Sequence, residues 1–90
     1  MAIIAIFEVE GASADKYDEV IRRLTQMNLR VPDGQLYHVC YGDHRRLQVI
    51  DVFESRAKLD AFAAKLVPLL QEFSITARPA IFDVYNIIAT

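Results

Sequence analysis

Three residues of the sequence could do chemistry together: His38, Cys40 and Asp51. They flank Gly42–Arg45, a segment typical of the tight turn of a β-hairpin. Because side chains alternate along paired strands, all three are expected on one face of the sheet, with His38 and Asp51 as diagonal neighbours. A carboxylate beside an imidazole fixes its tautomer and makes it a usable general base. The pattern therefore favours His38 as acid/base and Asp51 as the group that orients it.

The pairing that we expect is centred between Asp43 and His44, which sets Val49 opposite His38 and Leu36 opposite Asp51.

The same residues allow a structural interpretation. Buried polar groups are normally hydrogen-bonded whether or not they act on a substrate, so His38 and Asp51 could form one satisfied pair in an apolar core. In the catalytic interpretation, Tyr17 or Asn86 holds a carbonyl or phenol oxygen of the substrate. Cys40 is interpreted as a small hydrophobic residue rather than a nucleophile, because a free cysteine inside a strand usually packs in that way.

Other site classes find no support in the residue pattern. The single cysteine excludes an internal disulfide and a multi-cysteine zinc site. The predicted turn separates His38 from His44, so the two histidines are not expected to enter one pocket. No phosphate-binding glycine loop, nucleophile elbow or zinc-binding helix motif occurs. We therefore expect neither a metal nor a cofactor.

Composition also limits the partners. The net charge is −2, whereas a nucleic-acid binder of this size would normally be basic, so no nucleic-acid partner is expected. The apolar N-terminus ends at Glu8 without a basic flank or a cleavage pattern, and no segment approaches the roughly 18 apolar residues of a membrane span. We therefore expect a cytoplasmic protein that does not enter a membrane.

Four strands and two helices are predicted to position the candidate residues. A helix begins after the N-cap Ser13 and ends near Leu29, and a second begins after Ser55. Pro68 is expected to kink the second helix or to split it at Val67. Thr76–Pro79 is predicted to be a connector. The predicted strands are Ile3–Val9, Gln35–Tyr41, Arg46–Phe53 and Ala80–Ile88.

The order of these elements predicts an α+β, ferredoxin-like βαββαβ fold. Two right-handed β-α-β units interleave, so the four-stranded antiparallel sheet has the order 4-1-3-2 and carries both helices on one face. At 90 residues the chain forms one domain, residues 1–90.

Both faces of the predicted sheet are apolar, although two helices can cover only one. In the first strand, Phe7 lies on one face and Ile6 on the other. A monomer would expose more apolar surface than proteins usually tolerate. We therefore expect a homodimer that packs sheet against sheet, with Tyr37 and Tyr41 at the interface.

The segment Val49–Phe62 resembles the dimeric α/β-barrel superfamily, which includes antibiotic biosynthesis monooxygenase-like proteins. It matches the family's pattern of an apolar strand, an aromatic residue, an acidic or basic residue, a serine and an amphipathic helix. Gly34–Val39 resembles the second strand of a small, uncharacterised bacterial branch. The resemblance implies a pocket between sheet and helices, with Phe53 facing it. The haem-degrading branch carries Asn, Trp and His at positions that match Ala5, Phe53 and Ala63, so haem degradation is not implied.

The resemblance implies a dimeric α/β barrel related to cofactor-free monooxygenases and isomerases. The predicted function is that of a homodimer whose pocket acts on or binds an apolar metabolite, aromatic or polyketide-like. The alternative is a non-catalytic ligand-binding or structural homodimer. The catalytic candidates are His38 and Asp51, and the substrate-binding candidates are Phe53, Tyr17, Cys40, Asn86 and Phe7.

Overall fold

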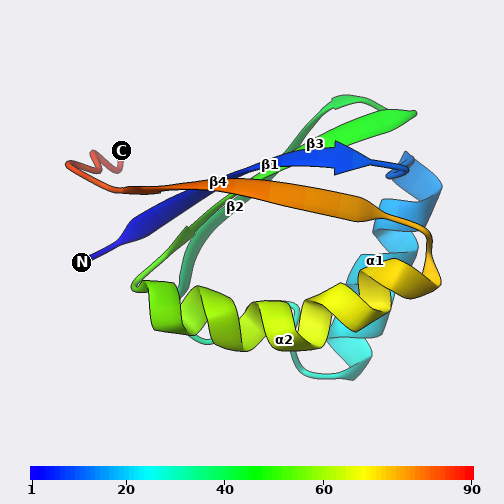
Figure 1. The fold of residues 1–90 in the computed structure, drawn as a ribbon, viewed down its shortest axis with the longest axis horizontal. Helices are drawn as coiled ribbons and strands as arrows, with labels where there is room; N and C mark the ends of the chain where they lie inside the picture. The colour runs from blue at the N-terminus through cyan, green and yellow to red at the C-terminus, as the bar shows by residue number, and fades with distance from the viewer.

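The computed structural model describes all 90 residues and confirms the βαββαβ order, with both helices on one face of a four-stranded antiparallel sheet (Figure 1). The strand order is β2-β3-β1-β4, which is the predicted 4-1-3-2 order counted from the other edge. Neither helix is long and apolar enough to cross a membrane. The elements are β1 Ile3–Glu10, α1 Ala14–Gln26, β2 Gln35–Asp43, β3 Arg46–Phe53, α2 Arg56–Glu72 and β4 Thr76–Asp83.

The helices begin where their caps predict, and α1 ends earlier than expected. Ser13 and Ser55 accept hydrogen bonds from the backbone N–H groups three residues on, as N-caps do. Helix α1 ends at Gln26 rather than near Leu29, because Asn28 takes a left-handed conformation (φ 59°).

Helix α2 runs through Pro68 without being split at Val67. Pro68 lies on the exposed side of the helix. The carbonyl that loses its donor can therefore turn to water, which makes the proline tolerable there.

The predicted position of the last strand is wrong. Strand β4 begins at Thr76, inside the expected connector, and ends at Asp83 instead of Ile88. It pairs along the whole of β1, from Glu10 opposite Thr76 to Ile3 opposite Asp83. Beyond Asp83 one more backbone hydrogen bond forms, from the Val84 N–H to the Ala2 carbonyl at 2.9 Å, and the chain of β1 then ends, which leaves no partner strand for residues 85–88. A proline inside β4 is tolerated because this strand lies at the edge of the sheet.

The register of the β2–β3 hairpin differs from the prediction by two residues. His38 lies directly opposite Asp51, and Cys40 lies opposite Val49. The loop consists of residues 44 and 45, and the Asp43 side chain accepts a hydrogen bond from the backbone N–H of Arg45 at 2.7 Å. Because the difference is an even number of residues, each side chain still lies on its predicted face.

Strand β2 contains an irregularity at Leu36. Gln35 pairs with Phe53 while Tyr37 pairs with the adjacent Val52, so Leu36 is an extra residue in the strand. The irregularity allows Gln35 to share a face with His38, although the two residues are three positions apart.

The core lies between the helices and the sheet. Phe53 is fully buried and packs on Phe62 of α2, with ring centroids 6.0 Å apart. We call the opposite side of the sheet, which no helix covers, the outer face. It carries apolar side chains that are 41–57% exposed, which confirms that the sheet is apolar on both sides: Ile6, Tyr37, Val39, Tyr41 and Phe82.

Candidate functional site

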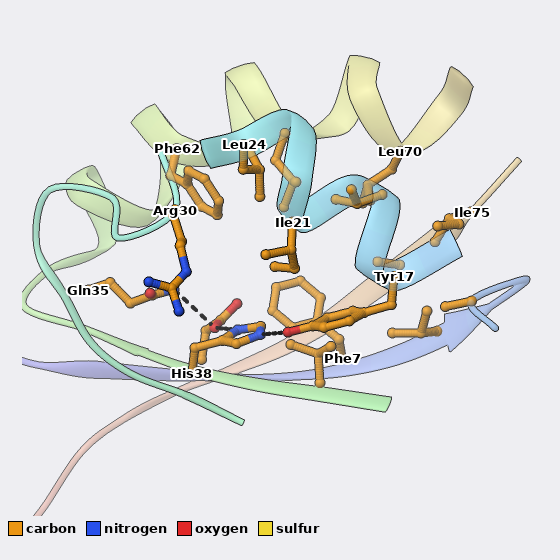
Figure 2. A pocket seen from close by; sticks show the side chains of 17 residues that line it. Phe7, Tyr17, Ile21, Leu24, Arg30, Gln35, His38, Phe62, Leu70 and Ile75 are labelled. Carbon is orange, nitrogen blue, oxygen red and sulfur yellow. Dashed lines mark hydrogen bonds and ion pairs between the residues drawn. The ribbon is translucent and has the colours of Figure 1, made fainter. Parts of the chain in front are cut away.

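A cavity of about 90 Å³ lies between the two helices and the sheet (Figure 2). Thirteen of its 17 lining residues are hydrophobic, so it suits an apolar ligand. Its apolar walls include Phe7 of β1, Ile21 and Leu24 of α1, and Phe62 and Leu70 of α2. Its polar side chains come from β2, β3, the start of α1 and the α1–β2 connection.

Tyr17, His38 and Asp51 form one chain of hydrogen bonds at this polar end (Figure 2). His38 Nδ1 lies 2.6 Å from Asp51 Oδ1, and Tyr17 Oη lies 2.6 Å from His38 Nε2. Because a carboxylate can only accept, Nδ1 carries a proton and donates a hydrogen bond to Asp51. In the neutral imidazole, Nε2 therefore accepts from the Tyr17 hydroxyl. The two rings are stacked, with 7° between their planes.

The start of α1 and the hairpin are tied together, which fixes Tyr17 over β2. The backbone N–H of Ala14 donates to the His44 carbonyl at 2.7 Å, and that of Leu47 donates to the Ala12 carbonyl at 2.9 Å. Asp51 comes from the inner strand β3 and is only 4% exposed. Its Oδ1 also accepts a hydrogen bond from Gln35 Nε2 at 3.2 Å.

Burial raises the pKa of the Tyr17 phenol to about 12, and the nearby Cys40 and Asp51 act in the same direction. The phenol is therefore a proton donor at ordinary pH. Burial also raises the pKa of the Cys40 thiol, which is unlike the lowered pKa of a reactive cysteine.

The structure brings together some of the predicted site residues and not others. Tyr17, His38, Asp51 and Phe7 line the cavity. Phe53 and Cys40 lie on the same side of the sheet but belong to the packed core around the cavity and not to its wall. Asn86 is exposed beyond the end of β4, so it does not reach the cavity. The expected position of Asn86 is wrong because β4 ends before it.

Two polar residues of the cavity are absent from the sequence-based prediction. Gln35 reaches the site through the irregularity at Leu36, which no periodic pattern indicates. Arg30 lies in the connection between α1 and β2, where periodicity carries no information. A basic residue shortly before the turn sequence Pro32–Gly34 is the only signal that could have pointed to it.

The chain does not bring together three or more histidine, cysteine, aspartate or glutamate side chains as a group that could hold a metal ion.

Comparisons with known proteins find similarity in structure alone. No protein-family model matches the sequence. No curated protein matches it either. The crystal structure of SnoaB, a cofactor-independent oxygenase from Streptomyces nogalater, is similar with a TM-score of 0.62 and 16% identity, over 99% of this chain and 96% of that chain.

Two further crystal structures have the same architecture. A candidate monooxygenase from Shewanella loihica matches with a TM-score of 0.57 and 19% identity, over 96% of both chains. A candidate antibiotic biosynthesis monooxygenase from Deinococcus radiodurans matches with a TM-score of 0.65 and 12% identity, over 100% of this chain and 98% of that chain. The chain therefore has the fold of antibiotic biosynthesis monooxygenase-like proteins, as the resemblance in its sequence implies.

Proposed function

We propose that the protein is a cofactor-free enzyme that removes a proton from an apolar phenolic or enolisable substrate, as the first step of an oxygenation or isomerisation. The observation that carries this proposal is the Tyr17–His38–Asp51 chain at the polar end of an apolar cavity. A base held by a carboxylate, beside a space for an apolar molecule, is what proton abstraction needs. A cofactor-independent oxygenase, SnoaB, has the same fold, and this supports an oxygenation without a cofactor.

Tyr17 occupies His38 Nε2, so the proton passes through the phenol. The substrate, through its phenol O–H or the C–H beside its carbonyl, gives a proton to Tyr17 Oη while the Tyr17 proton moves to Nε2. The substrate becomes an anion, His38 becomes an imidazolium ion, and the Asp51 carboxylate stabilises that positive charge. Because the pKa of Tyr17 is about 12, the phenol does not ionise alone and gives up its proton only as it receives another.

The transfer of α-hydrogens to solvent from 2-tetralone, an apolar enolisable ketone, tests this proposal. Nuclear magnetic resonance in deuterated buffer follows the exchange directly. The wild type should accelerate it, and His38→Gln should lower the rate by at least about 100-fold, the lower range for a lost general base. His44→Gln is the matched control, because His44 is exposed in the hairpin loop. Equal rates for wild type and His38→Gln would contradict the assigned base.

The non-catalytic alternative predicts a different result in the same experiment. 2-Tetralone would bind, as shown by a rise in the melting temperature, without any faster exchange. Binding without exchange would favour a ligand-binding protein over an enzyme.

We further propose that two copies pack through their outer faces. The support is the row of half-exposed apolar side chains on that face, which exceeds what one copy can shield. Val39→Asp tests the assembly, because Val39 is 49% exposed and its replacement should leave the fold of one copy intact. In a two-fold dimer the same surface of both copies is buried, so the interface would contain two unpaired carboxylates introduced by Val39→Asp, which destabilises the dimer. Light scattering should show a dimer for the wild type and a monomer for the variant, and two unchanged dimers would contradict the interface.

A further inference from the structure

The cavity contains one permanent cation that no group of the protein neutralises. Arg30 lines it, yet its guanidinium takes part in no ion pair and no hydrogen bond with another side chain. Figure 2 shows the Arg30 side chain reaching from the α1–β2 connection toward Gln35 and His38. Four other arginines are paired with carboxylates: Arg22, Arg23, Arg56 and Arg78. Arg45 and Arg46 at the hairpin are unpaired as well, but they lie outside the cavity, so Arg30 is the cation that distinguishes this site.

Neither nearby carboxylate satisfies Arg30. Asp51 is buried and already accepts hydrogen bonds from His38 and Gln35. Asp18 lines the same outer groove as Arg30 but forms no bond with it. The groove also contains Tyr17 and His38, so it leads from solvent past Arg30 to the reactive end of the cavity.

The space beyond this end is apolar and extends under α2. A second hollow of about 250 Å³ lies between α2 and the sheet and shares Phe7, Phe62 and Leu66 with the cavity wall. A ligand can therefore place an apolar body beneath the helices while one polar end remains near Arg30.

We propose that the site prefers apolar ligands that carry one carboxylate, and that Arg30 binds this carboxylate at the mouth of the cavity. This inference rests on the proposed function, since it names the substrate class of the same cavity. The planar fork of a guanidinium matches the two oxygens of a carboxylate. A single unpaired cation with Asp18 close by favours one negative charge over the two of a phosphate ester. Arg30 is thus a specificity-determining residue.

A matched pair of probes tests the inference. 2-Naphthoate and 2-naphthamide have the same ring and nearly the same shape, and only the naphthoate is charged. Calorimetric titration of the wild type should give a dissociation constant about tenfold lower for the naphthoate, which corresponds to ~1.4 kcal/mol. Arg30→Gln keeps a hydrogen-bond donor without the charge, and should reduce this preference to less than about twofold. Arg45→Gln, in the hairpin loop outside the cavity, is the control and should keep the full preference.

The outcomes separate this inference from the proposed function. If both probes bind equally to the wild type, or if Arg30→Gln keeps the preference, the carboxylate site is refuted while the cavity remains a ligand site. If neither probe binds, the carboxylate site and the ligand cavity are both refuted. If the preference depends on Arg30 but 2-tetralone exchange is not accelerated, the carboxylate site stands and the catalytic proposal fails. Salt should weaken naphthoate binding and leave naphthamide binding unchanged.

Discussion

Replacing Asp51 by Asn distinguishes a catalytic pair from a structural one. Asp51 is 4% exposed, and its carboxylate has no permanent cation within ion-pair distance, because its only charged partner would be a protonated His38. The variant keeps the shape of the side chain and an oxygen that accepts from His38 Nδ1. It removes the negative charge and replaces the second oxygen, Oδ2, which accepts a hydrogen bond from neither His38 nor Gln35, by an NH2 group.

The expected change in stability follows from two opposing terms. Keeping an ionised carboxylate buried costs several kcal/mol, which the amide does not pay. A hydrogen bond to a charged acceptor contributes about 1.5–3 kcal/mol, and one to a neutral acceptor contributes about 0.5–1.5 kcal/mol. Each of the two bonds, from His38 and from Gln35, is therefore weakened by about 1–1.5 kcal/mol, which gives a loss of about 2–3 kcal/mol together. These terms nearly cancel, and the free energy of unfolding should change by less than ~1 kcal/mol. The rate of 2-tetralone exchange should nevertheless fall at least about tenfold, because an amide stabilises the imidazolium less.

Urea unfolding followed by circular dichroism measures the first quantity, at equal protein concentration and with the slope compared between variants. Asp83→Asn is the control for loss of one carboxylate, because Asp83 is exposed at the end of β4 and forms no hydrogen bond through its side chain. A loss of more than about 3 kcal/mol in Asp51→Asn, with unchanged exchange, is the signature of a structural pair and would refute the catalytic role.

Three further predictions concern Tyr17, Gly11 and Ser55. The ultraviolet difference spectrum between wild type and Tyr17→Phe should show ionisation of the Tyr17 phenol near pH 12 instead of pH 10. Because the pKa of Tyr17 is higher in the folded than in the unfolded state, the free energy of unfolding of the wild type should fall as the pH rises from 10 to 12. The free energy of unfolding of Tyr17→Phe should fall less over the same range. Gly11→Ala should cost at least about 2 kcal/mol in urea unfolding, because Gly11 has φ +85° and a Cβ would lie 2.6 Å from the Ser74 carbonyl oxygen. Gly42→Ala should lower the free energy of unfolding by less, because Gly42 also has a positive φ (+103°) but its Cβ would lie at a tolerable 3.4 Å from the Arg46 carbonyl oxygen. A larger loss for Gly42→Ala than for Gly11→Ala would contradict the argument from this contact. Ser55→Ala removes the acceptor for the Lys58 N–H and should cost about 1 kcal/mol by the same measurement, whereas an unchanged value would show that the cap contributes nothing.

The arrangement of the elements was predictable because it depends on periodic patterns. Alternation along the strands places His38 and Asp51 on one face in any register that differs by an even number of residues, so an error of two positions changed their distance and not their side. The helix starts were predictable because the caps Ser13 and Ser55 act through hydrogen bonds to backbone N–H groups only three residues away. The position of β4 was not predictable from its own residues, because it is set by where β1 begins and ends.

The candidate site was predictable only in part, because two of its five polar side chains, Arg30 and Gln35, are positioned by irregular backbone. Gln35 and His38 are three residues apart, a spacing that would place them on opposite faces of a regular strand. The extra residue Leu36 cancels this alternation, and Gln35 then donates to the same carboxylate oxygen as His38. Arg30 comes from the connection that precedes this irregularity. Gln35, which orients Asp51, and Arg30, which places a positive charge at the mouth of the cavity, therefore depend on the non-periodic part of the chain. His38 and Asp51 depend on the periodic part. Substitutions of Arg30 and Gln35 should accordingly alter which ligand binds more than they alter the fold.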